Sequence, residues 1–165
     1  DDTAAALREK LVPAIEKLRI GISTDPEAHY GPVVNEAHRQ RIENYIQLCV
    51  DEGGELVVYG RGFSLQGHEK GFFVGPTLFD HVKPSFRSYQ EEIFGPVLQM
   101  VRADSFEEAL VLAVNLADDS DSVGAVTGQL AGALYGLSGI PERWLEPLAW
   151  RERIVEMADS LIATR

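Results

Sequence analysis

One cysteine and four histidines are the side chains of this sequence that could supply a thiolate nucleophile or an imidazole ligand. Cys49 shares an apolar stripe with Ile42 and Ile46, and a cysteine in such a position behaves as a small buried hydrophobe. The histidines lack the spacing of a zinc site. They lie in predicted loops and on one helix face, at His29, His38, His68 and His81. We therefore expect Cys49 to belong to the core and no zinc site to form.

Two acidic clusters are the other groups that could do chemistry. Glu91 and Glu92 are adjacent, and by residue type alone they are a solvated acidic pair. Asp118, Asp119 and Asp121 stand at the predicted start of a helix, where carboxylates interact favourably with the positive end of the helix dipole. Residue type alone therefore favours structural roles for both clusters.

The composition indicates one globular, acidic protein. The chain has 165 residues, is 45% hydrophobic and carries a formal net charge of -11. Such a charge repels phosphate backbones and anionic lipids, so we expect neither a nucleic-acid nor a membrane partner. No stretch approaches the roughly 18 to 20 apolar residues of a membrane span, and no export signal is evident. A single cysteine excludes an internal disulfide and is compatible with a reducing compartment, so we expect a cytoplasmic protein.

Three helices that would position these residues are predicted in the part of the chain before residue 116. Apolar spacing predicts a helix over residues 3–19, which Pro13 kinks or restarts. Asn35 is expected to cap a second helix that runs to about Asp51. Ser105 and Glu108 form a capping box at the start of a third.

Strands alternate with these helices. The residue types predict strands at 55–59 and 97–101, and another at 72–79 that is broken near Gly75-Pro76. The glycine-rich stretch 60–71 is predicted to be a loop. The sequence up to about residue 104 is therefore expected to fold as mixed α/β.

The last third of the chain predicts an all-helical tail. Four glycines, Gly124, Gly128, Gly132 and Gly136, recur every fourth residue, which would place a groove on one helix side for a close backbone partner. A final helix over about 145–163 is expected to bury four apolar side chains. These are Leu148, Ile154, Met157 and Leu161.

Several strings, in this order, resemble the aldehyde dehydrogenase superfamily over residues 1 to about 110. They are Gly31-Pro32-Val33, Gly71–Leu78, Glu91-Glu92-Ile93-Phe94-Gly95-Pro96-Val97 and Ser105–Ala109. Residues 60–73 are most similar to the methylmalonate-semialdehyde branch, whose members use coenzyme A as acyl acceptor. The resemblance implies an α/β fold class, in which residues 1–104 form a fragment of a catalytic domain with helices and a few strands.

The resemblance also implies a cofactor edge without a catalytic residue. Glu92 would match the carboxylate that binds the nicotinamide-ribose hydroxyls of NAD, and Phe94 the aromatic side chain beside the same ribose. The nucleophilic cysteine of the family lies shortly before the first residue of this sequence, and the dinucleotide-binding domain is missing. We therefore expect a fragment of an NAD-dependent oxidoreductase that is inactive alone.

Residues 105–165 resemble a different family, the helical, magnesium-dependent ADP-ribosylglycohydrolases. The resemblance rests on residues 115–122, 128–136 and 139–144. It implies that Asp119, Asp121 and Ser122 match part of a magnesium centre, because hard carboxylate and hydroxyl oxygens suit this ion. Ser122 replaces the usual threonine and Ala117 a usual glycine, and the remaining ligands of the family are absent, so magnesium binding should be weak.

A fusion with its seam near residues 105–110 accounts for both resemblances. Three functions remain open: a remnant semialdehyde dehydrogenase, a structural or assembly module, and a remnant ADP-ribosylglycohydrolase. We expect a homo-oligomer in any case, because a fragment with interface helices exposes apolar surface that favours self-association.

Overall fold

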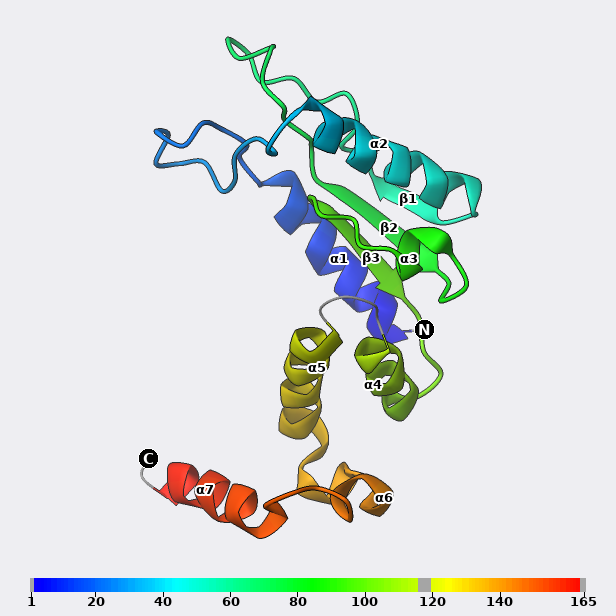
Figure 1. The fold of residues 1–165 in the computed structure, drawn as a ribbon, viewed down its shortest axis with the longest axis vertical. Helices are drawn as coiled ribbons and strands as arrows, with labels where there is room; N and C mark the ends of the chain where they lie inside the picture. The colour runs from blue at the N-terminus through cyan, green and yellow to red at the C-terminus, as the bar shows by residue number, and fades with distance from the viewer. Residues whose placement is uncertain (1, 116–119, 164–165) are drawn as a thin grey trace. The chain divides into compact units, whose positions relative to one another are not determined.

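The computed structural model describes residues 2–115 and 120–163, and the chain divides into two compact units, Asp1–Ser120 and Asp121–Arg165. The predicted domain boundary after residue 104 rests on resemblance to two families. A division into compact units does not test it, so this boundary stays a prediction. Across the described ranges, no helix combines the length and apolar content of a membrane crossing. The first unit holds α1 (Asp2–Glu16), α2 (Glu36–Asp51), β1 (Glu55–Val58), β2 (Thr77–Val82), α3 (Arg87–Gln90), β3 (Val97–Val101) and α4 (Phe106–Val114), shown in Figure 1.

The capped second helix was predicted correctly. The Asn35 side chain accepts a hydrogen bond of 2.8 Å from the amide of His38, which satisfies one of the free donors at the start of α2. Its buried stripe includes Ile42, Ile46 and Cys49. Cys49 is 0% exposed, which confirms its place in the core, and burial raises the pKa of its thiol.

The three strands form one sheet in the order β1-β2-β3, with β1 antiparallel and β3 parallel to the central β2. Strands β1 and β3 confirm the predictions at 55–59 and 97–101. The strand predicted over 72–79 with a break near Gly75-Pro76 is confirmed only from Thr77, because β2 covers Thr77–Val82. Residues 72–76 bond to loops instead: the Phe72 carbonyl accepts from the Val33 amide at 2.9 Å, and the Gly75 amide donates to Gly60.

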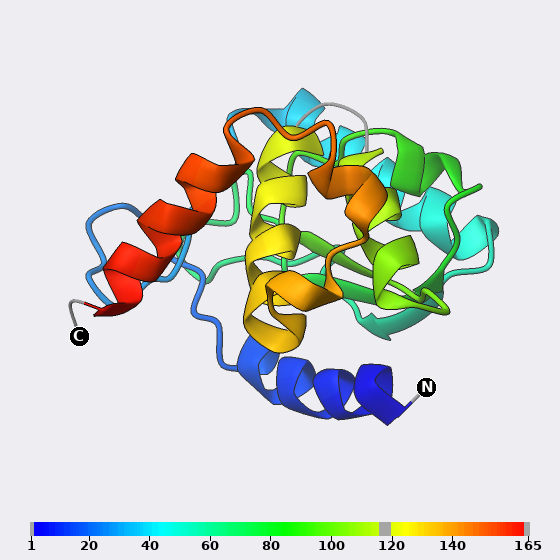
Figure 2. The same ribbon diagram turned by 90° about the horizontal axis from the view of Figure 1, so that it is seen from below.

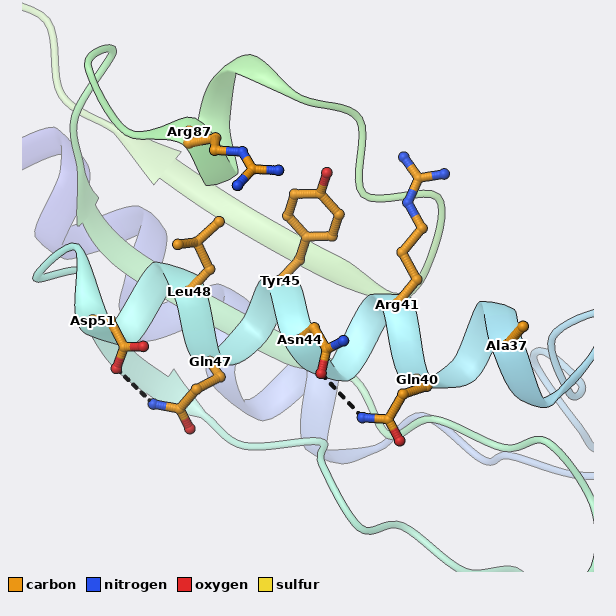
Figure 3. Close-up of a pocket in the computed structure, with 9 residues that line it drawn as sticks. All are labelled: Ala37, Gln40, Arg41, Asn44, Tyr45, Gln47, Leu48, Asp51 and Arg87. Atoms are coloured by element: carbon orange, nitrogen blue, oxygen red, sulfur yellow. Dashed lines mark hydrogen bonds between the residues drawn. The ribbon is translucent and has the colours of Figure 1, made fainter.

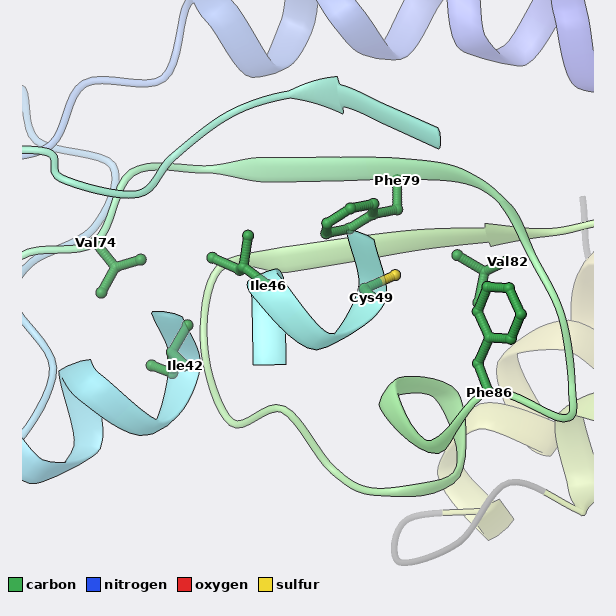
Figure 4. Packing of buried hydrophobic residues seen from close by; sticks show 7 residues of the cluster. All are labelled: Ile42, Ile46, Cys49, Val74, Phe79, Val82 and Phe86. Atoms are coloured by element: carbon green, nitrogen blue, oxygen red, sulfur yellow. The ribbon is translucent and has the colours of Figure 1, made fainter. Parts of the chain in front are cut away.

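Alternate residues of β2 face two helices, which lie on opposite sides of the sheet (Figures 1 and 2). Leu78 packs with Ile15 of α1 and Met100 of β3. Phe79 faces the other way, into a cluster with α2 (Figure 4). The members of that cluster are Ile42, Ile46, Cys49, Val74, Phe79, Val82 and Phe86. Burial of both faces explains why β2 is the most enclosed strand.

A buried carboxylate lies on the α1 side of the same strand. Asp80 is 0% exposed, and the Arg102 guanidinium contacts both its oxygens, at 3.2 and 2.8 Å. Arg8 of α1 adds a third contact at 3.3 Å. Burial acts to raise the pKa of Asp80, but Arg102 and the donated amide of His81 outweigh it and lower the pKa below its ordinary value. The charged form is therefore the one the fold stabilises.

Two glycines allow the loop after β1 to pass against the segment before β2. The Gly75 amide donates to the Gly60 carbonyl at 2.8 Å, and the Gly60 amide donates to the Thr77 hydroxyl at 3.1 Å. A Cβ added to Gly60 would lie 1.9 Å from the Gly75 carbonyl oxygen. Only a residue without a side chain fits at position 60.

The second unit contains nearly all of α5 (Ser120–Tyr135), a 3-10 turn (Leu137–Gly139), α6 (Glu142–Leu145) and α7 (Arg151–Ala163). Gly136 ends α5 with a positive φ of 66°. A Cβ added to Gly128 or Gly132 meets nothing within 4 Å among the described atoms, so the predicted close backbone partner is not found there.

The final helix also differs from its prediction. It begins at Arg151, after a separate short helix α6 that ends at Leu145. The expected burial was wrong, since all four predicted side chains are exposed. These are Leu148, Ile154, Met157 and Leu161.

Candidate cofactor-binding edge

The segment Glu91–Pro96 connects α3 to β3 and is held against the core at its C-terminal end. The Pro96 carbonyl accepts a hydrogen bond of 2.9 Å from the Thr77 amide of β2. Gly95 lies on Ile42 so closely that an added Cβ would be 2.5 Å from the Ile42 Cδ1. The backbone that carries Glu92 and Phe94 is therefore fixed by contacts with α2 and β2.

Glu91 is fully engaged within the fold. Its carboxylate takes an ion pair of 2.5 Å from Arg87 Nε and a hydrogen bond from the Tyr45 hydroxyl. In Figure 3, the Arg87 side chain, which comes from α3, lies on the side of α2 from which Tyr45 projects. The Arg87 guanidinium, followed by the Tyr45 hydroxyl, lowers the pKa of Glu91. Glu91 is thus a structural anchor for the segment.

Glu92, next to it, is different. Its side chain is exposed, and among the described residues its carboxylate has no hydrogen-bond or ion-pair partner. Only its backbone is bound, because the carbonyl oxygen lies 3.5 Å from Arg41 Nη2. Phe94 is also exposed, at 68%. The structure therefore presents a carboxylate and an aromatic ring together, on a segment whose backbone is held.

His38 of α2 supports Phe94 in two ways. Its Nε2 donates to the Phe94 carbonyl oxygen at 2.6 Å, and the two rings stack with centroids 5.9 Å apart and an interplanar angle of 21°. From sequence, His38 is one of four scattered histidines. The one signal that could have separated it is its place on α2, one turn before the buried Ile42.

An open groove of about 710 Å³ runs along the outer face of α2 (Figure 3). Arg41, Tyr45 and Arg87 line it, together with polar side chains of the helix. Neither Glu92 nor Phe94 is among the lining residues. The groove and the edge formed by Glu92 and Phe94 are therefore separate features.

The predicted magnesium residues fall partly outside the described residues. Asp119 lies outside them, and for Asp121 only the backbone is described, in the first turn of α5. Ser122 is exposed on the same helix. Magnesium coordination stays a prediction without geometric support.

Glu55, Asp80 and His81 form another acidic group, with ligand atoms within 4.8 Å of one another. Asp80, however, already binds Arg102 and Arg8, and Glu55 pairs with Arg8 at 2.8 Å. Two guanidinium charges at this position oppose a metal cation. The group is better described as an ion-pair network that joins α1 to the sheet.

Comparison with known proteins identifies the family of this chain. The sequence model of the aldehyde dehydrogenase family matches residues 1–136. The chain therefore belongs to the aldehyde dehydrogenase family.

The relatives of this chain include semialdehyde dehydrogenases. A malonate-semialdehyde dehydrogenase from Pseudomonas aeruginosa is 50% identical over 112 residues, which are 68% of this chain and 22% of that protein. The acylating mitochondrial methylmalonate-semialdehyde dehydrogenase of Arabidopsis thaliana is 41% identical over 107 residues, 65% of this chain and 18% of that protein. The chain spans about a fifth of the length of these relatives.

Among solved structures, a methylmalonate-semialdehyde dehydrogenase from Sinorhizobium meliloti complexed with NAD is similar, with a TM-score of 0.68 and 42% identity. The match covers 78% of this chain and 28% of that one. The likeness at this identity extends to both fold and sequence.

Proposed function

We propose that this chain is part of the catalytic domain of an NAD-dependent semialdehyde dehydrogenase and contributes the edge that binds the nicotinamide ribose. One observation carries the proposal: Glu91 is bonded internally, whereas Glu92 and Phe94 are exposed together on a fixed segment. The relative complexed with NAD supports the choice of cofactor.

The two exposed side chains suit a ribose. A carboxylate can accept hydrogen bonds from two neighbouring hydroxyls, and its charge strengthens both. Phe94 offers an apolar face beside it, which His38 holds by stacking and by its bond to the Phe94 carbonyl. When bound, NAD supplies the hydride acceptor. The chain's own residues would bind and orient the ribose.

The nucleophile of the reaction must come from outside these residues. The thiolate is the reactive form of cysteine, and Cys49 is fully buried with a raised pKa, so it is a poor nucleophile. The chain is accordingly expected to be inactive alone. The acylating relative supports coenzyme A as the acyl acceptor of the whole protein, with malonate or methylmalonate semialdehyde as substrate.

Thermal unfolding with and without NAD tests the cofactor edge. A ligand that binds only the folded state at a hundredfold excess over its Kd stabilises by about 2.7 kcal/mol. This is several degrees in melting temperature for a domain of this size. Glu92→Gln and Phe94→Ala should each reduce the shift, because each removes one contact. Glu9→Gln is the matched control, an exposed glutamate of α1 that should leave the shift unchanged.

Two outcomes would contradict the proposal: no shift with excess NAD, or an equal shift in the control and in both edge variants. Formation of NADH from an aldehyde by this chain alone would contradict the expected lack of a nucleophile.

The ADP-ribosylglycohydrolase resemblance of residues 105–165 stays a prediction, and the family match through residue 136 overlaps it. The same assay with ADP-ribose and magnesium tests it. A shift that Asp121→Ala abolishes would support a remnant of that enzyme, and no shift with either ligand would favour the structural module.

A further inference from the structure

The exposed face of α7 has the spacing of a helix–helix seam. Trp150, just before the helix, is 77% exposed, and Ile154 and Met157 are 47% and 58% exposed. They follow one another at steps of four and three residues, and Leu161, 71% exposed, continues the series after four more. These steps place Ile154, Met157 and Leu161 on one stripe of α7, as at the a and d positions of a coiled coil, and the exposed Trp150 lies just before the helix. We call these exposed side chains the α7 stripe, and Figure 2 shows the backbone of α7 in red.

One flank of the α7 stripe carries a charge of each sign. Arg153 and Glu156 line an open groove of about 550 Å³ together with Met157 and Leu161. Both charged side chains are exposed, and within the described ranges neither has an ion-pair partner. A partner that covers the stripe would therefore meet an arginine and a glutamate on the same side.

We propose that α7 packs antiparallel against α7 of a second copy of this chain. An antiparallel two-fold arrangement places Ile154 opposite Met157 of the second copy, and Leu161 near the first turn of the second copy's α7. The same flank of each helix then meets, so Arg153 comes within reach of Glu156 of the second copy, and the reverse pair forms by symmetry. The face is self-complementary in both its apolar and its charged groups.

The local charge also favours a second copy. The whole chain carries -11, which opposes self-association in general. Within α7, however, two arginines stand against three acidic residues, so this helix is almost neutral. Two copies can approach there without strong repulsion. Three side chains that the sequence predicts to be buried, Ile154, Met157 and Leu161, would then be buried between copies. This inference does not depend on the NAD edge.

Charge reversal tests the arrangement. Sedimentation equilibrium of the whole chain should show a monomer–dimer equilibrium. Arg153→Glu and Glu156→Arg should each raise the dimer Kd about tenfold, because each breaks two symmetric pairs and opposes like charges. The double variant Arg153→Glu/Glu156→Arg should return the Kd close to that of the parent, because the swapped charges pair again. Met157→Glu should abolish the dimer.

Leu130→Glu, a change at an apolar residue of α5 that is 69% exposed, is the matched control and should leave the Kd unchanged. A monomer at every concentration would overturn the proposal. So would a double variant as weak as the two single variants, or a dimer that Leu130→Glu disrupts as strongly as Met157→Glu. If all the monomeric variants unfold at the same melting temperature, the changes act on association and not on folding.

Discussion

Asp80→Ala should lower the free energy of unfolding of the first unit by about 3 kcal/mol, the lower end of the cost of breaking a buried ion pair. The carboxylate is fully buried and accepts from two guanidiniums, so its removal leaves Arg102 and Arg8 without their shared counter-charge. Urea denaturation followed by circular dichroism measures the change. Glu55→Gln is the control: its carboxylate is 44% exposed and pairs at the surface, where such a pair contributes about 1 kcal/mol or less.

The same carboxylate gives the stability a defined pH dependence. The folded-state pKa of Asp80 lies below its ordinary value of 3.8. Its contribution is therefore fully present above the unfolded pKa and is lost as the pH falls through the folded pKa. Asp80→Asn should flatten the stability profile below about pH 4 relative to the parent. An unchanged slope in acid would contradict the assigned role, as would a small effect of Asp80→Ala at neutral pH.

Gly60→Ala should destabilise the fold to a similar extent, by about 3 kcal/mol, the upper range for overpacking. The added Cβ would lie 1.9 Å from the Gly75 carbonyl oxygen and 2.7 Å from the Thr77 hydroxyl. Both neighbours take part in the hydrogen bonds that join the loop to the start of β2. The steric clash can therefore be removed only if the hydrogen bonds at Gly60 break. Chemical denaturation of the purified variant measures the loss.

Gly128→Ala is the opposite control for the same substitution. It lies inside α5, where the added Cβ meets nothing within 4 Å among the described atoms. Alanine is favoured over glycine in a helix interior by about 1 kcal/mol, so this variant should gain stability. If both alanine variants had the same effect, close approach at Gly60 would not be the cause.

Elements fixed by local signals were predictable from sequence. Asn35 caps α2 as expected, and β3 covers the predicted residues, because a capping side chain and a short apolar run act through near neighbours. Cys49 follows from the apolar periodicity of α2 in the same way. The prediction for β2 was wrong in its limits, because these depend on distant residues. Asp80 stays within the strand since Arg8 and Arg102, far away in sequence, neutralise it.

The candidate site shows the same division. The string from Glu91 to Val97 is recognisable in the sequence, but residue type does not distinguish two adjacent glutamates. The distinction comes from α2 and α3, where Tyr45 and Arg87 engage Glu91 and leave Glu92 exposed. His38 could not be selected for a similar reason, since its partner is a backbone carbonyl 56 residues away. The spacing of residues along the sequence does not reveal contacts of this kind.

Cys49 gives the chain a built-in reporter of how often its core opens. It is the one cysteine of the sequence, and its side chain is buried between α2 and the sheet. An alkylating reagent can reach it only after α2 separates from the sheet. When reclosing is fast, the labelling rate is proportional to the population of that open state and gives its free energy. A thiol that is a poor nucleophile in the folded chain can thus measure, by its rare reactivity, how firmly this part of the fold stays closed.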